Sequence, residues 1–585
     1  MIREAVQHRA NRIDAYAINS KELQILLKTK KNDVEKVELL IGDPYDWKGS
    51  RWNFTTVSMT ISGRDELFDY WIANVTPELR RLRYGFNLFN KKESVFYGEK
   101  GFRNDPPEDI GDYFCFPYLN KADIFTAPEW VKNTVWYQIF PERFANGDPS
   151  LNPESTVPWG SEEPKVNNFF GGDLQGVIDH LDYLEDLGIS GIYFTPIFKA
   201  TSNHKYDTID YFEIDEHFGD KELLKKLIAE CKNRGIRVML DAVFNHGGFY
   251  FPPFQDVLKR GKGSKYNEWF HLWEYPVETR PKPNYDTFGF EYKMPKFNTE
   301  NPEVKNYLLE VGRYWAREFD IDAWRLDVAN EVDQSFWREF RKEVKAINPD
   351  LYILGEIWHD AIPWLKGDQF DAVMNYPFTN NVLLLFAKKE ITPKQFVENM
   401  TKVQHMYPKN INLVTFNLVG SHDTPRILTE CGNDKQSLKQ VFTLLLTYYG
   451  TPSIYYGDEI GLTGEQDPGC RKCMEWEEHN QDTDLRDFVK TLISLRKKEP
   501  LLANEGSFIF LSPELSDKSF GYVHSNDTES IIVLFNTSDK KDKVKLLFDS
   551  TPSSVDDLLT DQKIKWKNGK ITLEPHEAKL IKLTH

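Results

Sequence analysis

The stretch FDIDAWRLDVAN (319–330) begins as an apolar, strand-like run and ends on a carboxylate, Asp327. Side chains alternate along a strand with a period of two, so Arg325 and Asp327 project from the same face. Two further apolar runs end in the same way: LYILGEIWH (351–359), which delivers Glu356, and INLVTFNLVGSHD (411–423), which delivers Asp423. Glycoside hydrolysis is the chemistry that most often places two or three carboxylates around one bond.

Short apolar runs of this kind recur eight times, with amphipathic helical patterns between most of them. The other five are VWYQIFPERF (135–144), GISGIYFTPIF (188–198), GIRVMLDAVFNH (235–246), FDAVMNYP (370–377) and PSIYYGDEIG (452–461). Helices are predicted over 174–188, over 220–235 with Gly235 as C-terminal cap, and from Asn301-Pro302 onward. Eight strand–helix alternations predict an α/β fold, a (β/α)₈ TIM barrel with its active site at the C-terminal ends of the strands.

The pattern changes outside the barrel. Residues 1–123 alternate with a period of two and predict an N-terminal β-sandwich, and residues 503–585 predict a second one at the C-terminus. The barrel takes 124–246 and 301–502. The intervening 247–300 lacks a clear helical period and is expected to form an excursion domain at the barrel mouth. The N-terminal module binds sugar or another subunit, or is a packing domain with no ligand. Near the C-terminus, Asn568-Gly569 predicts a hairpin turn.

Composition excludes several classes of protein. A formal charge of −17 over 585 residues argues against nucleic acid, whose phosphates need basic patches. No apolar leader and no 18-residue apolar span are present, so a membrane role is not expected. Five cysteines are too few for a disulfide framework, and the Cys470/Cys473 pair has no second pair to complete a zinc site. A cytoplasmic location is expected.

Four motifs in order carry a resemblance to a known family: DAVFNH (241–246), WRLD (324–327), GEIW (355–358) and SHDT (421–424). They resemble the conserved regions of the family 13 glycoside hydrolases, the α-amylase family. The N-terminal module and MPKFN (294–298) resemble the cyclomaltodextrinase, neopullulanase and maltogenic amylase subgroup, whose commoner motif is MPKLN.

The resemblance implies a retaining double displacement, with Asp327 as nucleophile, Glu356 as general acid/base and Asp423 as transition-state stabiliser. The residues agree with these roles: Arg325 is expected to lower the pKa of Asp327 and hold it ionised. Glu356 can protonate the glycosidic oxygen if an apolar surrounding keeps it protonated. Trp358 shares its face and is expected to form part of that surrounding, or a platform for the leaving sugar.

Further substrate contacts are implied by the same resemblance. His246, His422 and Tyr206 match residues that bind the sugar next to the cleavage point. Asp241 and Asn245 are expected to support them. The residues expected to grip the non-reducing end of the substrate are Arg426, Asp467 and Arg471.

A calcium site is implied by FANGDPSLNP (144–153) together with GGD (171–173), because clustered oxygen ligands suit a hard cation. The implied ligands are Asn146, Asp148, Asn152, Gly171 and Asp173. Leu151 departs from the pattern, since only its backbone carbonyl offers oxygen. The alternative is an ordinary Asn-Gly-Asp turn.

The subgroup cleaves α-1,4 bonds of cyclomaltodextrins, pullulan and maltooligosaccharides, transfers sugars to some extent, and forms dimers in which the N-terminal module covers the partner's barrel mouth. These properties are expected here. The alternatives are another family 13 activity, such as a starch-preferring α-amylase or an α-1,6-glucosidase, and a non-catalytic sugar-binding or transporter-associated relative.

Overall fold

The computed structural model describes residues 1–10, 13–512, 515–546, 552–564 and 569–585. It divides into two compact units. One comprises residues 1–126, 389–413 and 505–585, and the other comprises 127–388 and 414–504. The second unit contains the barrel. Among the described residues, every helix is too short or too polar to cross a lipid bilayer.

The barrel sheet has eight parallel strands in the order β20-β19-β18-β17-β14-β13-β22-β21. Their bounds are β13 Trp136–Ile139, β14 Gly191–Phe194, β17 Arg237–Ala242, β18 Ala323–Leu326, β19 Tyr352–Gly355, β20 Ala372–Val373, β21 Phe416–Leu418 and β22 Thr451–Tyr455. The first strand pairs with the last, Tyr137 lying opposite Ile454, and a bridge between Met374 and Phe416 joins the other two ends. The ring is closed, and the prediction of a barrel is confirmed.

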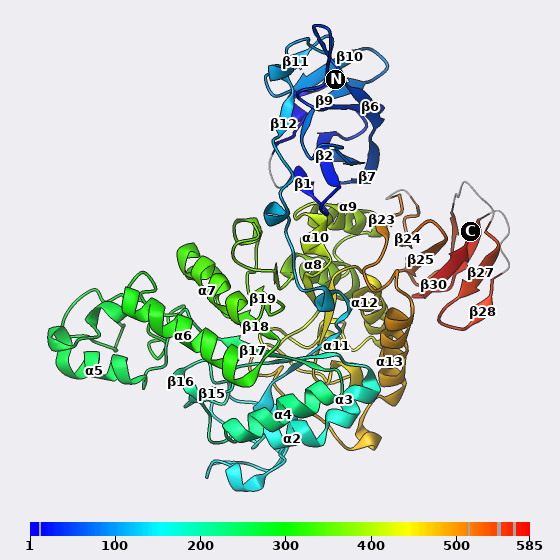
Figure 1. The fold of residues 1–585 in the computed structure, drawn as a ribbon. Helices are drawn as coiled ribbons and strands as arrows, with labels where there is room; N and C mark the ends of the chain where they lie inside the picture. The colour runs from blue at the N-terminus through cyan, green and yellow to red at the C-terminus, as the bar shows by residue number, and fades with distance from the viewer. Residues whose placement is uncertain (11–12, 513–514, 547–551, 565–568) are drawn as a thin grey trace. The chain divides into compact units, whose positions relative to one another are not determined.

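Helices surround these strands, as Figure 1 shows for α4, α6 and α7 outside β17, β18 and β19. The main helices are α4 Lys221–Asn233, α6 Pro302–Phe319, α7 Gln334–Ile347, α8 Tyr376–Val382, α12 Lys435–Thr447 and α13 Thr483–Lys498. The predicted start of α6 is confirmed, because the Asn301 side chain caps the helix and Pro302 follows at its first position. Gly235 closes the turn after α4 with φ +70°.

The helix predicted over 174–188 is two helices, α2 Leu174–Asp179 and α3 Leu181–Leu187. The break lies at His180, whose ring Nδ1 is 2.8 Å from the backbone oxygen of Gly176. In an unbroken helix that oxygen would accept the N–H of residue 180. Periodicity alone does not reveal such competition between a side chain and the backbone.

The excursion segment between β17 and α6, whose sequence has no clear helical period, contains the helix α5 Pro252–Arg260. Pro252 is the first residue of the helix, and the side chains of Phe254 and Val257 form part of its buried face. Nine residues are too few for a clear period. Phe297 of MPKFN is buried in the same segment and packs on Phe270 at a centroid distance of 5.6 Å.

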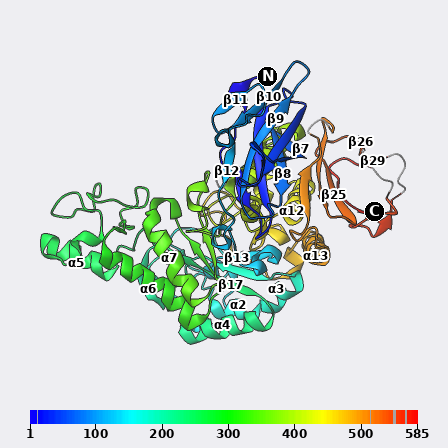
Figure 2. The ribbon, with the colours of Figure 1, turned by 45° about the horizontal axis from the view of Figure 1, so that its top comes forward.

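The N-terminal part of the other unit is a two-sheet sandwich (Figure 2). One sheet has the strands β1 Ala15–Ala17, β2 Leu23–Lys30, β7 Thr60–Arg64 and β8 Phe68–Val75. The second has β3 Lys36–Gly42, β6 Thr55–Ser58, β9 Leu82–Phe89, β10 Ser94–Gly98, β11 Gly101–Arg103 and β12 Phe114–Phe116. Alternate residues of β2 and β9 share the core between the sheets, as their sequence period predicts.

The C-terminal part is also a β-structure. Its six-stranded sheet contains β23 Ser507–Phe510, β24 Ser519–Ser525, β25 Glu529–Asn536, β27 Ser554–Asp557, β28 Gln562–Lys563 and β30 Ala578–Thr584, and β26 Asp542–Lys545 pairs with β29 Lys570–Leu573. The predicted turn at Asn568-Gly569 falls partly outside the described residues. The same unit holds the helices α9 Pro393–Gln404 and α10 Lys409–Asn412, a segment that the sequence assigned to the barrel.

Candidate active site

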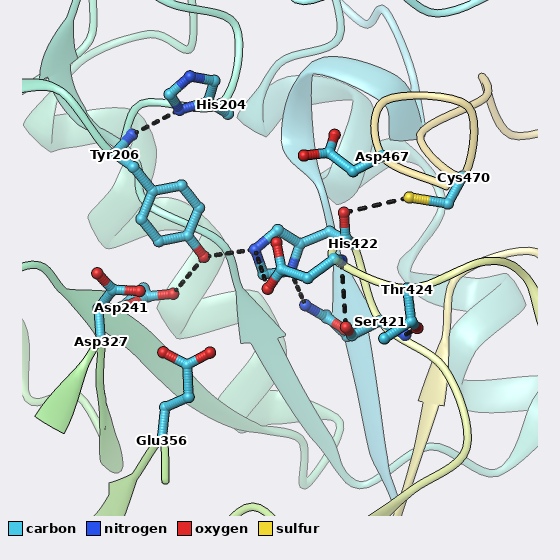
Figure 3. A network of polar contacts seen from close by, with 12 residues as sticks. His204, Tyr206, Asp241, Asp327, Glu356, Ser421, His422, Thr424, Asp467 and Cys470 are labelled. Atoms are coloured by element: carbon cyan, nitrogen blue, oxygen red, sulfur yellow. Dashed lines mark hydrogen bonds and ion pairs between the residues drawn. The ribbon is translucent and has the colours of Figure 1, made fainter. Parts of the chain in front are cut away.

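The three carboxylates lie at the C-terminal ends of barrel strands. Asp327 directly follows β18, Glu356 directly follows β19, and Asp423 lies in the loop after β21. Parallel strands in a closed barrel present these ends at one rim. Figure 3 shows Asp327, Glu356 and the neighbouring Asp241 around one space.

One guanidinium joins these groups. Arg325 is fully buried on β18, and its Nη1 lies 2.7 Å from Oδ1 of Asp327 and 3.0 Å from Oδ2 of Asp241. Its Nη2 lies 2.9 Å from Oε1 of Glu356. Three carboxylates therefore share one positive charge. The alternation that places Arg325 and Asp327 on one face is what makes this contact possible.

This sharing corrects the expected ionisation of Asp327. Burial raises the pKa of Asp327 well above its ordinary value, and Arg325 only partly opposes that effect. Burial also raises the pKa of Asp241 to about 6. A guanidinium with a single carboxylate would lower its pKa, but here it is divided among three. Asp327 and Asp241 therefore retain their protons more strongly than isolated carboxyl groups do.

Both oxygens of Glu356 accept hydrogen bonds. The backbone N–H of Val328 donates to Oε2 at 2.9 Å, and the indole N–H of Trp358 donates to Oε1 at 3.2 Å. Trp358 is itself 47% exposed and stacks on Tyr376, with ring centroids 3.6 Å apart and planes 8° from parallel. An exposed tryptophan held flat beside an acid is suited to stacking on a sugar ring.

His422 connects two sides of the site. Burial lowers the pKa of His422 well below its ordinary value, so the ring is neutral. Gln138 donates its amide hydrogen to Nδ1 at 2.8 Å, which places the ring hydrogen on Nε2. Nε2 lies 2.7 Å from the hydroxyl oxygen of Tyr206 and 3.2 Å from Oδ2 of Asp423. Tyr206 in turn donates to Asp241 at 3.0 Å, as Figure 3 shows.

The loop HKYDT (204–208) is anchored on both sides of Tyr206. Lys205 adopts φ +63° and is buried, with its Nζ 2.9 Å from Oδ2 of Asp215. Asp207 accepts hydrogen bonds from the hydroxyls of Thr201 and Ser202. The tyrosine ring lies between these anchors and faces His422, with planes 6° from parallel.

His246 is buried beside the excursion segment, and its ring stacks on Phe288 at a centroid distance of 5.2 Å. Asn245 contacts its Nδ1 at 3.2 Å. Nε2 has no hydrogen-bond partner among the described residues, and burial lowers the pKa of His246 to about 3. A neutral imidazole with a free nitrogen is suited to a sugar hydroxyl.

The predicted Asp–Arg pair reaches Asp423. Arg471 lies 3.0 Å from Asp467 and 3.4 Å from Asp423, and its Nε donates to the backbone oxygen of His422 at 2.8 Å. Asp467 is 38% exposed on its side chain. These two residues therefore belong to the site.

Arg426, by contrast, does not face the site. Its side chain has no exposed surface, lies 2.9 Å from Oδ1 of Asp458 and donates to the backbone oxygen of Cys470. This position corrects the prediction that Arg426 grips the substrate. Arg426, fully buried with a carboxylate and a backbone carbonyl as partners, stabilises the loop that carries Asp467 and Arg471.

The residues of the predicted calcium site lie together. Asp173 caps α2 and accepts the backbone N–H groups of Gly147, Asp148 and Gly176. Asn146 contacts Asn152 at 3.0 Å. A side chain at Gly171 would collide with both amides. The Oδ1 atom of Asn146 is buried and has no hydrogen-bond partner in the described chain.

Sequence reasoning missed several supporting residues. Gln138 on β13 orients His422, Tyr193 on β14 donates to Asp241 at 3.0 Å, and Tyr376 supports Trp358. A signal was available for Gln138, because a polar residue inside the apolar run VWYQIF needs a buried partner. Tyr193 and Tyr376 carry no such signal, since tyrosine is common in buried strands.

Comparison with known proteins identifies the class. Residues 138–503 match the alpha amylase catalytic domain, and residues 1–120 match the alpha amylase N-terminal ig-like domain. A maltogenic alpha-amylase of Bacillus acidopullulyticus is 60% identical, with 99% of this chain and 100% of that protein covered. Neopullulanase 2 of Thermoactinomyces vulgaris is 43% identical, with 99% of both covered. The solved structure of a cyclomaltodextrinase matches with a TM-score of 0.95 at 48% identity, covering 100% of both chains.

The chain belongs to the alpha-amylase family and is a family 13 glycoside hydrolase.

Proposed function

We propose that this glycosidase hydrolyses α-1,4-glucosidic bonds of cyclomaltodextrins, pullulan and maltooligosaccharides with retention of configuration. Asp327 is the nucleophile, Glu356 the general acid/base and Asp423 the stabiliser of the transition state. The observation that supports these roles best is the contact of one guanidinium, Arg325, with both Asp327 and Glu356. A retaining mechanism needs the two carboxyl groups about 5–5.5 Å apart, a spacing that two groups on one guanidinium can adopt.

In the first step a carboxylate oxygen of Asp327 attacks the anomeric carbon, and Glu356 gives its proton to the departing glycosidic oxygen. In the second step Glu356 takes a proton from water, whose oxygen displaces Asp327 from the glycosyl ester. The attack requires Asp327 in its ionised form, and the guanidinium of Arg325 at 2.7 Å favours that form.

The sugar on the non-reducing side of the cleaved bond is held by neutral hydrogen-bonding groups. Nε2 of His246 has no partner in the described chain, and a sugar hydroxyl supplies one. The ring of Tyr206 supports the sugar face, and His422 contacts the sugar from the loop after β21. Asp467 and Arg471 grip the non-reducing end. This assignment agrees with their contacts to Asp423 and His422.

The test compares initial rates on β-cyclodextrin, pullulan and soluble starch, with products resolved by chromatography and Asp327→Asn as the inactive control. We expect cyclodextrin to be cleaved well ahead of starch, with α-maltose as main product in early NMR spectra. A starch rate equal to or above the cyclodextrin rate would instead support a starch-preferring amylase. Early β-anomers would reject retention.

Sugar transfer accompanies hydrolysis in this proposal. The half-exposed face of Trp358 lies next to Glu356, where an acceptor sugar can replace water in the second step. We expect products longer than the substrate when maltotriose is supplied at high concentration. Trp358→Ala should reduce the ratio of transfer to hydrolysis, and an unchanged ratio would contradict this role.

The protein is a homodimer in this proposal, with the N-terminal module at the interface. That module exposes three aromatic side chains close together in sequence, Tyr45 at 76%, Trp47 at 42% and Phe54 at 41%. Exposed aromatic residues of this kind are enriched at protein interfaces. Analytical ultracentrifugation should show a dimer that Tyr45→Ser with Trp47→Ser weakens, and a wild-type monomer at micromolar concentration would reject the proposal.

Calcium binds the loop after β13 in this proposal. The donor set fits a hard divalent cation, because Asp148 and Asp173 bring two negative charges and the unpartnered Oδ1 of Asn146 lies nearby. Addition of calcium to chelator-treated protein should raise Tm, and Asp148→Asn should abolish that increase. An equal Tm with and without calcium would reject the calcium site and favour the alternative, an ordinary Asn-Gly-Asp turn. A cytoplasmic location is also part of this proposal, and it is supported by the name of a relative 48% identical, the intracellular maltogenic amylase of Bacillus subtilis.

A further inference from the structure

We propose that Val328 is a positioning residue whose backbone N–H fixes the acid/base carboxylate of Glu356. This inference rests on the acid/base role proposed for Glu356. Val328 directly follows Asp327, so one turn of the chain carries the nucleophile and aims a hydrogen bond at the acid. The N–H lies 2.9 Å from Oε2 of Glu356.

The backbone of Val328 is in a conformation that valine rarely adopts. Its φ is +45° and its ψ is +42°, in the left-handed region. A β-branched residue there is a genuine outlier, because its side chain crowds the following carbonyl. Strain of this kind persists only where surrounding contacts enforce it, and it concentrates at functional sites.

Hydrogen bonds hold the turn on both sides of Val328. On one side the N–H of Asp327 donates to the backbone oxygen of Ala242 at 3.0 Å. On the other, Ala329 donates to the backbone oxygen of Glu356 at 3.3 Å, and the indole of Trp337 donates to the oxygen of Ala329 at 2.8 Å. The turn is held at both ends, and Val328 in its middle points its N–H at the carboxylate.

The two carboxylate oxygens of Glu356 have different partners. Val328 holds Oε2, while Trp358 and Arg325 contact Oε1. A carboxyl group held only at Oε1 can pivot about that oxygen, and misplacement of an acid by a fraction of an ångström is costly in catalysis. Val328 supplies the second point of attachment, so the plane of the carboxyl group is fixed relative to Asp327.

The test depends on the leaving group. A sugar leaving group needs protonation by the acid, whereas fluoride departs from α-maltosyl fluoride without it. A defect in positioning the acid therefore lowers kcat/KM for β-cyclodextrin and spares kcat/KM for α-maltosyl fluoride. A general structural defect lowers both.

The variant replaces the amide N–H of Val328 by an ester oxygen, with α-hydroxyisovalerate incorporated into the full chain by nonsense suppression. It keeps the side chain, removes the N–H donor and makes the preceding carbonyl of Asp327 a weaker acceptor. Val328→Gly is the matched control, since glycine adopts the left-handed turn readily and keeps the N–H. Glu356→Ala serves as the benchmark for complete loss of the acid.

We expect the ester to lower kcat/KM for β-cyclodextrin about 10-fold or more and to change that for the fluoride less than about two-fold. Val328→Gly, which keeps the N–H, should lose less kcat/KM for β-cyclodextrin than the ester does. Equal losses on both substrates, or no loss for the ester, would overturn the role of Val328. If Glu356→Ala itself fails to spare the fluoride, the proposed acid/base role falls instead.

Discussion

Arg325 and Asp327 lie two residues apart on one strand, and their side chains meet at 2.7 Å. The contact is a local consequence of strand geometry, but its electrostatic effect is not local. The same guanidinium also serves Asp241 and Glu356, so its charge cannot fully neutralise any one of them. Function at this site depends on how the positive charge of Arg325 is shared among three carboxyl groups.

Arg325→Lys should lower kcat/KM for β-cyclodextrin by about 100-fold or more. The variant keeps the charge but loses the planar fork that reaches carboxylates from both nitrogens. Arg341→Lys is the control, since Arg341 also contacts a buried carboxylate, Asp371 at 2.8 Å, away from the site. If both variants lose activity equally, the fork at Arg325 has no special role.

Asp241→Asn should change how stability depends on pH. The pKa of Asp241 is about 6 in the folded protein and 3.8 ordinarily, so the folded state holds more protons between these values. The contribution of Asp241 to the free energy of unfolding is fully present below about pH 4 and is lost as the pH rises to about 6. That loss is at most roughly 3 kcal/mol.

The asparagine variant does not titrate, so its Tm should fall less than that of wild type from pH 4 to pH 6. Differential scanning fluorimetry across this range provides the measurement. Asp105→Asn, at an exposed position of the N-terminal module, is the control and should follow the wild-type curve. Parallel curves for wild type and Asp241→Asn would contradict the raised pKa.

Tyr206→Phe and Tyr206→Ala should separate two roles of one side chain. Phenylalanine keeps the ring but breaks the hydrogen bonds to Asp241 and His422, so we expect kcat to fall about 10-fold with little change in KM. Alanine also removes the platform and should raise KM. Steady-state kinetics on maltotriose distinguishes the cases, and a raised KM for the phenylalanine variant would contradict this division.

Asp467→Ala should raise KM for maltotriose with little effect on kcat, because Asp467 is exposed and, among the described residues, joins the site through its contact with Arg471. Arg471→Ala should lower kcat as well, since Arg471 also holds Asp423 and the backbone of His422. The two variants are measured side by side. Identical effects would mean that the pair acts only as an ion pair.

Much of the fold was predictable because the barrel strands are buried on both faces and read as short apolar runs. Asn301-Pro302 predicted the start of α6 because capping is a local property. The break at His180 was not predictable, since it arises from a ring that competes with the backbone for the Gly176 oxygen. The helix α5 was not predicted because nine residues are too few to show a clear helical period.

In the site, too, local features could be predicted from the sequence and long-range contacts could not. The positions of Asp327 and Glu356 followed from strand endings, which sequence displays directly. The raised pKa of Asp327 comes first from burial, and Asp241, 86 positions earlier, adds to it from the other side of the same guanidinium. The burial of Arg426 depends on Asp458 from the segment after β22. Such effects come from the closed ring, where residues far apart in sequence compete for one partner.

The pairing of β13 with β22 also sets an order of events during synthesis. Tyr137 meets Ile454, so a nascent chain that has not yet reached Thr451 leaves β13 and β21 as open sheet edges. Asp327 and Glu356 leave the ribosome well before that point. The active site thus remains part of an unfinished cylinder while residues 357–451 are made, and exposed edges in that interval invite pairing with other chains.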